Sequence, residues 1–302
     1  MNLQNRKILI LGCKGQLGSY LSLSLSKENL VRGLSREDCD FLNEINLENF
    51  VKTYNPSLII NCVAYTDVDK AEFEKNIVTK VNVDFNKIIC KICNRNDIWL
   101  MHFSTDFVFK GDDLKPMKEN EICKPINFYG ESKRKGELVI MDLMKKYTIL
   151  RLSGVYSNQA NNFPMKIIQK LKENKEISVV DDQTASPTSV YFISNVVEIW
   201  IKKFFLSDKK NLSGLFHLST TGYCSRYELA EKIKIFLSNY LVGSENYKIV
   251  PIKTTNSYKS AKRPIFSALN SEKLSNLLNY PFESWEYDIN KFLNKFHKEF
   301  LK

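Results

Sequence analysis

A tyrosine and a lysine stand four positions apart in "FYGESKRKGE", residues 128–137. On a helix, side chains at i and i+4 lie on one face, so Tyr129 and Lys133 would point the same way. A nearby ammonium stabilises a tyrosine anion and lowers its pKa from the ordinary value of about 10. Such a pair can donate a proton to a substrate oxygen. Because the chain has 14 tyrosines, the flanking elements must decide whether this pair is functional.

Short apolar runs alternate with helical patterns through the first half of the chain. Strands are predicted at 7–12, 30–35, 57–64, 98–105 and 147–156. Between them, helices are predicted at 16–26, 46–54, 74–95 and from residue 129. Asn46 is the expected cap of the helix at 46–54. This alternation favours an α/β fold, a Rossmann-type doubly wound parallel sheet with helices on both faces.

The second half is less regular. It contains a helix followed by a strand within 162–182, an apolar helix at 189–205, a short strand at 214–219, and two further helices at 225–237 and 285–300. Because no segment has the composition of a linker, two lobes in extensive contact are expected. We expect residues 1–155, together with about 189–218, to form the larger domain. Residues 156–302 then form the smaller, partly interleaved C-terminal lobe.

Composition places the chain among ordinary water-soluble proteins, with 43% hydrophobic and 26% charged residues in 302. No apolar run approaches the roughly 20 residues of a membrane span, and "MNLQNRKILIL" lacks the features of a signal peptide. We therefore expect a cytoplasmic protein that does not bind membranes. The net charge of +10 is dispersed among acidic residues, which favours a nucleotide or sugar phosphate over nucleic acid as partner.

The seven cysteines do not form the pattern of a disulfide framework, because their number is odd and they are scattered. Cys90 and Cys93 form a single C-x-x-C in "IICKIC". A redox or zinc role is one interpretation. A helix that buries small apolar side chains is the favoured one, since no second cysteine pair accompanies them.

Glycines follow the first predicted strand in "ILILGCKGQLGSYL", at Gly12, Gly15 and Gly18. In this context glycine permits a tight turn and lets a pyrophosphate approach backbone N–H groups at the start of a helix. The pattern predicts a dinucleotide site, although a plain strand-to-helix turn remains an alternative.

The end of the second strand usually selects the cofactor, because an acidic residue there binds the ribose 2′-hydroxyl of NAD. In "GLSREDCDF" the expected position holds Ser35 and Arg36, which suit a 2′-phosphate. NADPH is therefore favoured, and NADH remains possible. Asp40 and Phe41 are expected near the adenine; the alternative is a loop acid beside a core aromatic.

These elements give the Tyr129–Lys133 pair a context. "STDFVF", residues 104–109, ends the fourth strand, and Tyr129 begins a later helix, so both belong to the carboxyl edge of the sheet, where ligands bind. The hydroxyl of Thr105 can hold a substrate carbonyl oxygen beside the phenol. Together these groups supply what hydride transfer to a ketone with proton donation requires.

The chain resembles the extended short-chain dehydrogenases/reductases, and within them it is similar to the dTDP-4-dehydrorhamnose reductase family. The resemblance rests on "GCKGQLG", "NCVAYTDVDKAE", "HFSTDFVFKG", "KPINFYGESKRKGE", "VVDDQTASPTS" and "AKRPIFSALN", in order along nearly the whole chain. It implies NADPH-dependent reduction of the C4 ketone of a nucleotide-linked 4-keto-6-deoxy sugar. The expected reaction converts dTDP-4-dehydrorhamnose to dTDP-L-rhamnose for polysaccharide synthesis, with the C-terminal lobe binding the nucleotide sugar.

The resemblance also implies roles for individual residues. Tyr129 is the proton donor, Lys133 lowers its pKa and holds the nicotinamide ribose, and Thr105 positions the carbonyl. Cofactor contacts are implied for Gly15, Gln16, Leu17, Ala64, Tyr65, Thr66 and Phe103. Substrate contacts are implied for Asp106, Asn162, Phe163, Arg263 and Ser267.

Simpler interpretations remain open for several polar residues. Arg263 is also consistent with a loop anchor. Asp67, Asp69 and Glu72 are expected to cap or brace a helix rather than act on substrate. His217, on a short strand, is expected to be a hydrogen-bonded core histidine.

Two departures from the family pattern bear on function. Gly154 stands where the family usually has a tryptophan against the sugar, so the pocket is expected to be wider. The identity of the sugar is therefore left open. Some members form metal-bridged dimers through a carboxylate just after the glycine turn. The chain has Tyr20 there, so we expect no such metal; a homodimer remains possible.

Two other classes of function compete with the reductase. The regulatory beta subunit of methionine adenosyltransferase resembles the same family and needs no reductase activity. The intact set of Thr105, Tyr129 and Lys133 favours the enzyme. A nucleic-acid binder is indicated by net charge alone.

Overall fold

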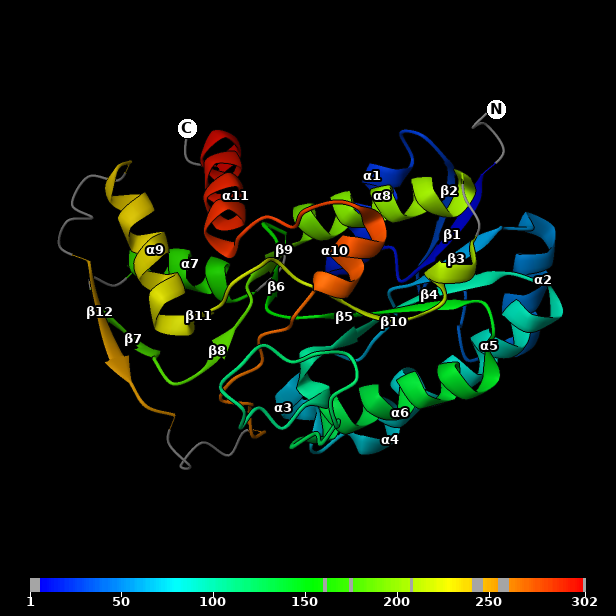
Figure 1. The fold of residues 1–302 in the computed structure, drawn as a ribbon, viewed down its shortest axis with the longest axis horizontal. Coiled ribbons are helices and arrows are strands. Elements are labelled where there is room, and N and C mark those ends of the chain that lie inside the picture. The colour runs from blue at the N-terminus through cyan, green and yellow to red at the C-terminus, as the bar shows by residue number, and fades with distance from the viewer. Residues whose placement is uncertain are drawn as a thin grey trace.

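The computed structural model describes residues 6–159, 162–173, 176–206, 209–240, 247–254 and 261–300. Within these ranges a six-stranded sheet forms the centre of the larger lobe, in the order β2-β1-β3-β4-β5-β10 (Figure 1). Every neighbouring pair is parallel. The strands are β1 (Lys7–Leu11), β2 (Leu30–Leu34), β3 (Leu58–Asn61), β4 (Trp99–Thr105), β5 (Tyr147–Leu152) and β10 (Gly214–Leu218).

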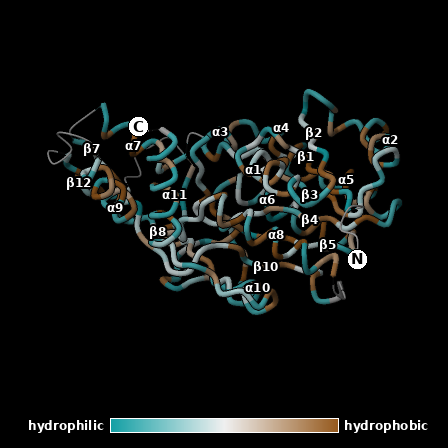
Figure 2. Tube along the Cα trace, turned by 90° about the horizontal axis from the view of Figure 1, so that it is seen from above, coloured by the Kyte–Doolittle hydropathy of each residue, from teal (hydrophilic) through white to brown (hydrophobic). Residues whose placement is uncertain are grey.

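Helices cover both faces of this sheet, which is why β1, β3 and β4 are buried along nearly their whole length rather than at alternate residues. One face packs on α1 (Gln16–Leu25), α8 (Val190–Leu206) and α10 (Glu272–Leu278). The other packs on α2 (Glu44–Tyr54), α5 (Phe85–Arg95) and α6 (Phe128–Leu143). Figure 2 shows the hydrophobic colour gathered along the interior of this lobe. The predicted Rossmann-type architecture is confirmed.

The strand order places a crevice beside the glycine turn. From β1 the chain goes to β2 on one side, and β3 then lies on the other side of β1. The connections after these strands therefore diverge at the carboxyl end of β1. Open α/β sheets bind their ligands at such a topological switch point.

The smaller lobe has a separate hydrophobic core and lies at the carboxyl edge of the sheet (Figure 1). It contains α7 (Phe163–Glu173), α9 (Arg226–Ser238), α11 (Trp285–Phe300) and the parallel pair β7 (Glu176–Val180) and β12 (Lys248–Ile252). Two short pairs connect it to the sheet. They are β6 (Val155–Tyr156) with β9 (Thr188–Ser189), and β8 (Thr184–Ala185) with β11 (Cys224–Ser225). The exact division of the chain into domains stays a prediction.

Two local predictions need correction. The cap of α2 is Asn43, not Asn46, because the Asn43 side chain accepts a hydrogen bond from the Asn46 backbone N–H at 3.1 Å. The segment 74–95 is not one regular helix. It comprises α4 (Lys75–Thr79), a π-helical turn at Lys80–Asp84 and then α5, preceded by the short α3 (Val68–Ala71).

Other local predictions are confirmed. The helix predicted at 225–237 is α9, and Ser225 and Glu228 form a capping box at its start. Cys90 and Cys93 of α5 are buried in the core, and burial raises the pKa of both thiols. No helix in the described ranges is long and apolar enough to cross a membrane.

A buried ion pair fixes α6 on the sheet. Arg151 of β5 donates from Nε and Nη2 to the two carboxylate oxygens of Glu137, each at 2.8 Å. Both side chains are 1% exposed or less. These hydrogen bonds hold the pKa of Glu137 below its ordinary value against the opposing effect of burial. Arg134, which is partly exposed, makes a second contact with the same carboxylate at 2.8 Å.

Arg151→Met should therefore destabilise the protein by about 3–5 kcal/mol, because it leaves a buried carboxylate without its main partner. The measurement is urea denaturation at neutral pH. Arg134→Met, which removes the exposed contact to the same carboxylate, should cost about 1 kcal/mol or less. The double variant Arg151→Met/Glu137→Met should recover much of the loss. Equal costs for the two single arginine variants would contradict this account.

Candidate active site

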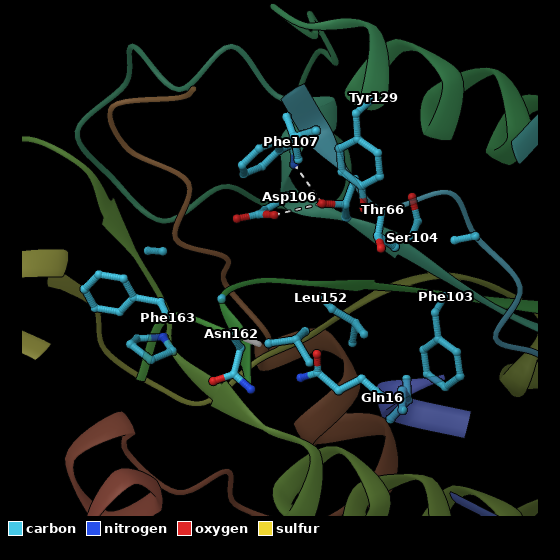
Figure 3. A pocket seen from close by; sticks show the side chains of 18 of the residues that line it. Gln16, Thr66, Phe103, Ser104, Asp106, Phe107, Tyr129, Leu152, Asn162 and Phe163 are labelled. Atoms are coloured by element: carbon cyan, nitrogen blue, oxygen red, sulfur yellow. Dashed lines mark hydrogen bonds between the residues drawn. The ribbon is translucent and has the colours of Figure 1, made fainter. Parts of the chain in front are cut away.

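A cavity of about 570 Å³ lies between the carboxyl ends of the strands and the smaller lobe (Figure 3). Its size is that of small-molecule and cofactor sites. Figure 3 shows Tyr129 and Asp106 on one side of the space and Asn162 and Phe163 on the other. The predicted residues that line it are Gly15, Gln16, Leu17, Ala64, Thr66, Phe103, Thr105, Asp106, Tyr129, Lys133, Gly154, Asn162 and Phe163.

The glycine turn fits a dinucleotide. Gly12 has φ +81°, and a Cβ on Gly18 would lie 2.2 Å from the Gly12 carbonyl oxygen, so turn and helix need both glycines. Gly15 caps α1, and the first residues of this helix, Gln16 and Leu17, line the cavity together with it, so the N-terminal end of the helix is at the cavity. The side-chain amide nitrogen of Gln16 is buried without a hydrogen-bond partner among the described residues. An unsatisfied donor in this position suits a pyrophosphate or nicotinamide, so these residues would hold a nicotinamide dinucleotide.

Lys133 carries its amine into the cavity wall although the residue is 2% exposed. Its Nζ donates to the backbone carbonyl of Phe103 at 2.7 Å and lies 3.2 Å from Nε2 of His102. Burial lowers the pKa of Lys133 to about 8, and the negative charge of Glu137 opposes that shift. Lys133 is therefore still largely cationic at neutral pH.

His102 is a neighbour of Lys133 that the sequence did not single out. The amide oxygen of Asn61 accepts from the Val63 N–H at 2.9 Å, so the amide nitrogen faces Nδ1 of His102 at 3.0 Å. A neutral imidazole accepts at only one nitrogen, so the Asn61 amide nitrogen at Nδ1 and the Lys133 ammonium at Nε2 cannot both donate to this ring. Burial and then the charge of Lys133 hold the pKa of His102 well below its ordinary value.

Tyr129 extends from the first turn of α6 toward the sheet, with its ring edge-on to Phe107. Burial raises the pKa of Tyr129 to about 12, a hydrogen bond with Thr105 lowers it, and the charge of Asp106 raises it. The phenol is therefore protonated at neutral pH and available as an acid. A cationic group at the cavity would stabilise the anion left after proton transfer.

Thr105 and Asp106 form a hydrogen-bonded unit at the end of β4. In this structure the single hydroxyl proton of Thr105 goes to Asp106 Oδ1 at 2.9 Å, so it must turn from Asp106 to bond to a ligand oxygen. The Ser153 hydroxyl donates to Oδ2 at 2.9 Å. Burial raises the pKa of Asp106, and hydrogen bonds from Ser267, Ser153 and Thr105 oppose the shift. Ser267 therefore contacts Asp106 and Ser153 but does not line the cavity.

Several predicted cofactor residues do not line this cavity. Ser35 and Arg36 follow β2, and the Ser35 hydroxyl and N–H both donate to Asp38, at 2.6 and 2.8 Å. These bonds lower the pKa of Asp38. A carboxylate that the sequence did not single out therefore lies beside Ser35, just after β2. Phe41 packs in the core, and Asp40 accepts from the Leu42 N–H.

Tyr65 is held away from the cavity by two contacts. Its hydroxyl donates to Glu74 at 2.6 Å, while its backbone N–H donates to the side-chain oxygen of Asn82 at 2.8 Å. Asn82 lies in the π-helical turn, which aims a buried amide at the strand-end loop carrying Ala64 and Thr66. Functional sites often contain such turns, but residue periodicity gives no signal for this one.

Arg263 is anchored rather than free. Its two terminal nitrogens donate to Asp69 at 2.8 and 2.6 Å, and it does not line the cavity. Asp67 caps α3, and Glu72 accepts from the Phe128 N–H, so the acids of this segment brace helices as expected. The alternative of a loop anchor is therefore the one that this structure shows.

His217 has the predicted role of a core histidine. It is fully buried, and its Nδ1 lies 3.0 Å from the carbonyl oxygen of Met117. Burial lowers the pKa of His217 to about 3.

Gly154 lines the cavity in a backbone conformation that does not admit a large residue. Its φ is +56°, and a Cβ there would lie 2.9 Å from the carbonyl oxygen of Ser186 and 3.0 Å from Cα of Pro187. A tryptophan at this position would require the loop to move. The wall of the cavity is therefore backbone at this point.

Tyr20 lies among polar and charged groups that include Glu299, whose carboxylate accepts from the Asn158 amide at 3.0 Å. Its hydroxyl bonds to Asn158 and, at 2.9 Å, to Tyr191, while the Lys295 amine lies 3.9 Å from the centre of the Tyr191 ring. In the described part of the chain, no three His, Cys, Asp or Glu side chains are grouped to hold a metal ion.

Comparison with known proteins identifies the family. The model of the RmlD substrate binding domain matches residues 6–298. The chain is 30% identical over 292 residues to a dTDP-4-dehydrorhamnose reductase of Shigella flexneri, covering 95% of this chain and 97% of that one. The chain belongs to the dTDP-4-dehydrorhamnose reductase family.

Other members of the family show its range. A dTDP-4-keto-6-deoxy-D-glucose reductase of Streptomyces niveus is 27% identical over 279 residues, covering 92% of this chain and 93% of that one. The crystal structure of a Bacillus anthracis dTDP-4-dehydrorhamnose reductase in complex with NADP has a TM-score of 0.86 and 32% identity. It covers 96% of this chain and 99% of that chain.

The burial of His102 and His217 makes a prediction that does not depend on activity. Between pH 8 and pH 5, ring-nitrogen NMR should show both rings neutral. Histidines of the unfolded chain take up protons near pH 6.5, whereas these buried rings stay neutral. The free energy of unfolding should therefore fall as pH falls below about 6.5, by about 2 kcal/mol for each ring at pH 5. Lys133→Met should raise the pKa of His102. A His102 that titrates near pH 6.5 would contradict the account of a neutral ring buried beside a cation.

Proposed function

We propose that this protein reduces the C4 ketone of a nucleotide-linked 4-keto-6-deoxy sugar, with dTDP-4-dehydrorhamnose as the favoured substrate and dTDP-L-rhamnose as the product. The observation that carries the proposal is the convergence of Tyr129, Thr105 and Lys133 on one cavity beside the glycine turn. Membership of a family whose named relatives reduce such sugars supports it.

The residues divide the work as follows. The bound nicotinamide supplies the hydride to C4. Thr105, fixed by Asp106, holds the ketone oxygen beside the Tyr129 phenol. Tyr129 donates its proton to that oxygen as negative charge develops there. Lys133, held by the Phe103 carbonyl, stabilises the tyrosine anion and would bind the nicotinamide ribose.

NADPH is the proposed cofactor, and NADH remains an alternative. Arg36 is exposed at the end of β2 and makes no ion pair in the described ranges, so its guanidinium is available to a 2′-phosphate. The neighbouring Asp38 carboxylate opposes a phosphate and favours a free ribose hydroxyl. The NADP bound to the Bacillus anthracis relative supports the first choice.

The sugar and the catalytic competence each have an alternative. Gly154 leaves backbone where an aromatic platform was expected, which favours a different 4-keto-6-deoxy sugar as the second candidate substrate. A non-catalytic, cofactor-binding regulatory subunit remains the alternative from another class. The complete set of catalytic groups in one cavity favours the enzyme over that subunit.

The proposed reaction is tested by following NADPH absorbance with dTDP-4-dehydrorhamnose. Tyr129→Phe should lower kcat by about 10²–10⁴-fold, because the proton donor is lost. Tyr65→Phe is the matched control, since it removes a phenol that bonds to Glu74 outside the cavity, and it should leave kcat nearly unchanged. NADPH binding without turnover on a panel of keto-sugar nucleotides would favour the regulatory subunit.

Cofactor preference is tested at Arg36. Arg36→Ala should weaken NADPH binding by about tenfold and leave NADH binding within about twofold, because only NADPH carries the 2′-phosphate. Arg32→Ala removes an exposed arginine from the body of β2 and should change neither. Titration of protein fluorescence gives both dissociation constants. Equal losses for the two cofactors would contradict a role of Arg36 in the preference.

A further inference from the structure

Arg226 brings a second cation to the cavity, from the smaller lobe. It is the first residue of α9 and lines the cavity together with Asn162 and Phe163. Its Nε donates to the side-chain oxygen of Gln183 at 2.9 Å, and its guanidinium lies over the Phe163 ring at 5.0 Å. Neither terminal nitrogen bonds to a described residue. The guanidinium is therefore held in place from one edge while its other edge faces the cavity.

No carboxylate among the described residues lies within 4 Å of Arg226, in contrast to three other arginines that lie in or near the body of the fold. Arg95 pairs with Glu44 and Glu48, Arg151 with Glu137, and Arg263 with Asp69. Burial lowers the pKa of Arg226, the charge of Arg263 lowers it further, and Asp106 raises it. A half-buried guanidinium in a cavity, with another cation nearby and no paired acid, needs an anion from a ligand.

The diphosphate of the proposed substrate would lie on the side of the cavity where Arg226 is. In a pyranose ring, C1 lies across from C4, and the diphosphate of a nucleotide sugar is attached at C1. When C4 is at Tyr129 and Thr105, the diphosphate leaves on the far side of the ring. Arg226 approaches from the opposite lobe and is close enough to Asp106 for their charges to interact.

We propose that Arg226 binds the diphosphate of the nucleotide-linked substrate through its two free terminal nitrogens. This assignment rests on the proposed function and adds to it the residue that recognises the nucleoside diphosphate class. A planar guanidinium suits bidentate contact with phosphate oxygens, and stacking on Phe163 together with the Gln183 bond fixes its orientation.

The other groups near Arg226 that could bind a diphosphate already have partners within the protein or lie elsewhere in the cavity. The start of α9 is occupied by its own capping box, because Glu228 accepts from the Ser225 N–H at 2.6 Å. Arg263 is bound by both oxygens of Asp69. Lys133, the other cation that lines the cavity in the described ranges, lies at the cofactor end.

The test is calorimetric binding of dTDP and thymidine to protein saturated with NADP⁺, so that the cofactor site is filled. Arg226→Gln should weaken dTDP binding by about 10- to 100-fold and leave thymidine binding within about twofold, because only dTDP carries the diphosphate. Arg226→Lys should fall between Arg226→Gln and the unchanged protein, since it keeps the charge but loses the planar fork.

Lys170→Gln is the matched control, because it removes an exposed charge of the same lobe from α7 and should leave dTDP binding unchanged. Unchanged NADP⁺ affinity shows that each variant is folded. Equal dTDP affinity of Arg226→Gln and the unchanged protein overturns the assignment and leaves the proposed function standing. Failure of the unchanged protein to bind dTDP at all overturns the proposed function and the assignment with it.

Discussion

An ammonium group has to be buried beside the cofactor crevice without losing its charge, and the larger lobe is arranged around that requirement. Burial alone would neutralise Lys133, since desolvation disfavours the charged form. The Phe103 carbonyl accepts from the amine, and the buried carboxylate of Glu137 raises its pKa. Lys133 therefore stays largely cationic at neutral pH, with a pKa of about 8.

The same requirement explains why α6 is tied to the sheet so firmly. Tyr129, Lys133 and Glu137 follow one another at i, i+4 spacing, so one helix face carries the acid, the cation and the counter-ion. Arg151 of β5 then fixes Glu137 from the sheet side. Any rotation of α6 would move the phenol and break the buried ion pair together. Fold stability and catalytic geometry thus depend on the same contacts at this face.

The sequence was sufficient for the features that depend on local pattern. Apolar runs predicted the strands, and glycine spacing predicted the tight turn, in which a Cβ at Gly18 would lie 2.2 Å from a backbone oxygen. Side-chain pairing across the fold was not predictable. The Asp38 contact to Ser35, the Asp69 clamp on Arg263 and the unpaired guanidinium of Arg226 depend on elements far apart in the chain or on loop geometry. A pattern identifies a residue type, but its partner decides whether the charge is available.

The two ends of the cavity differ in how fully their polar groups are hydrogen-bonded within the protein. This difference allows the reacting groups to stay fixed while the residues that select the substrate vary. At the reacting end, Thr105, Asp106 and Lys133 each have protein partners that fix them before any ligand binds. At the opposite end, Arg226 of the smaller lobe keeps both terminal nitrogens free of protein partners among the described residues, and Gly154 leaves a wall of backbone. A preorganised reacting end keeps the transition-state geometry constant. Under the proposed function, substitutions at the lobe end can then change which sugar nucleotide is held without disturbing Tyr129, the proposed proton donor.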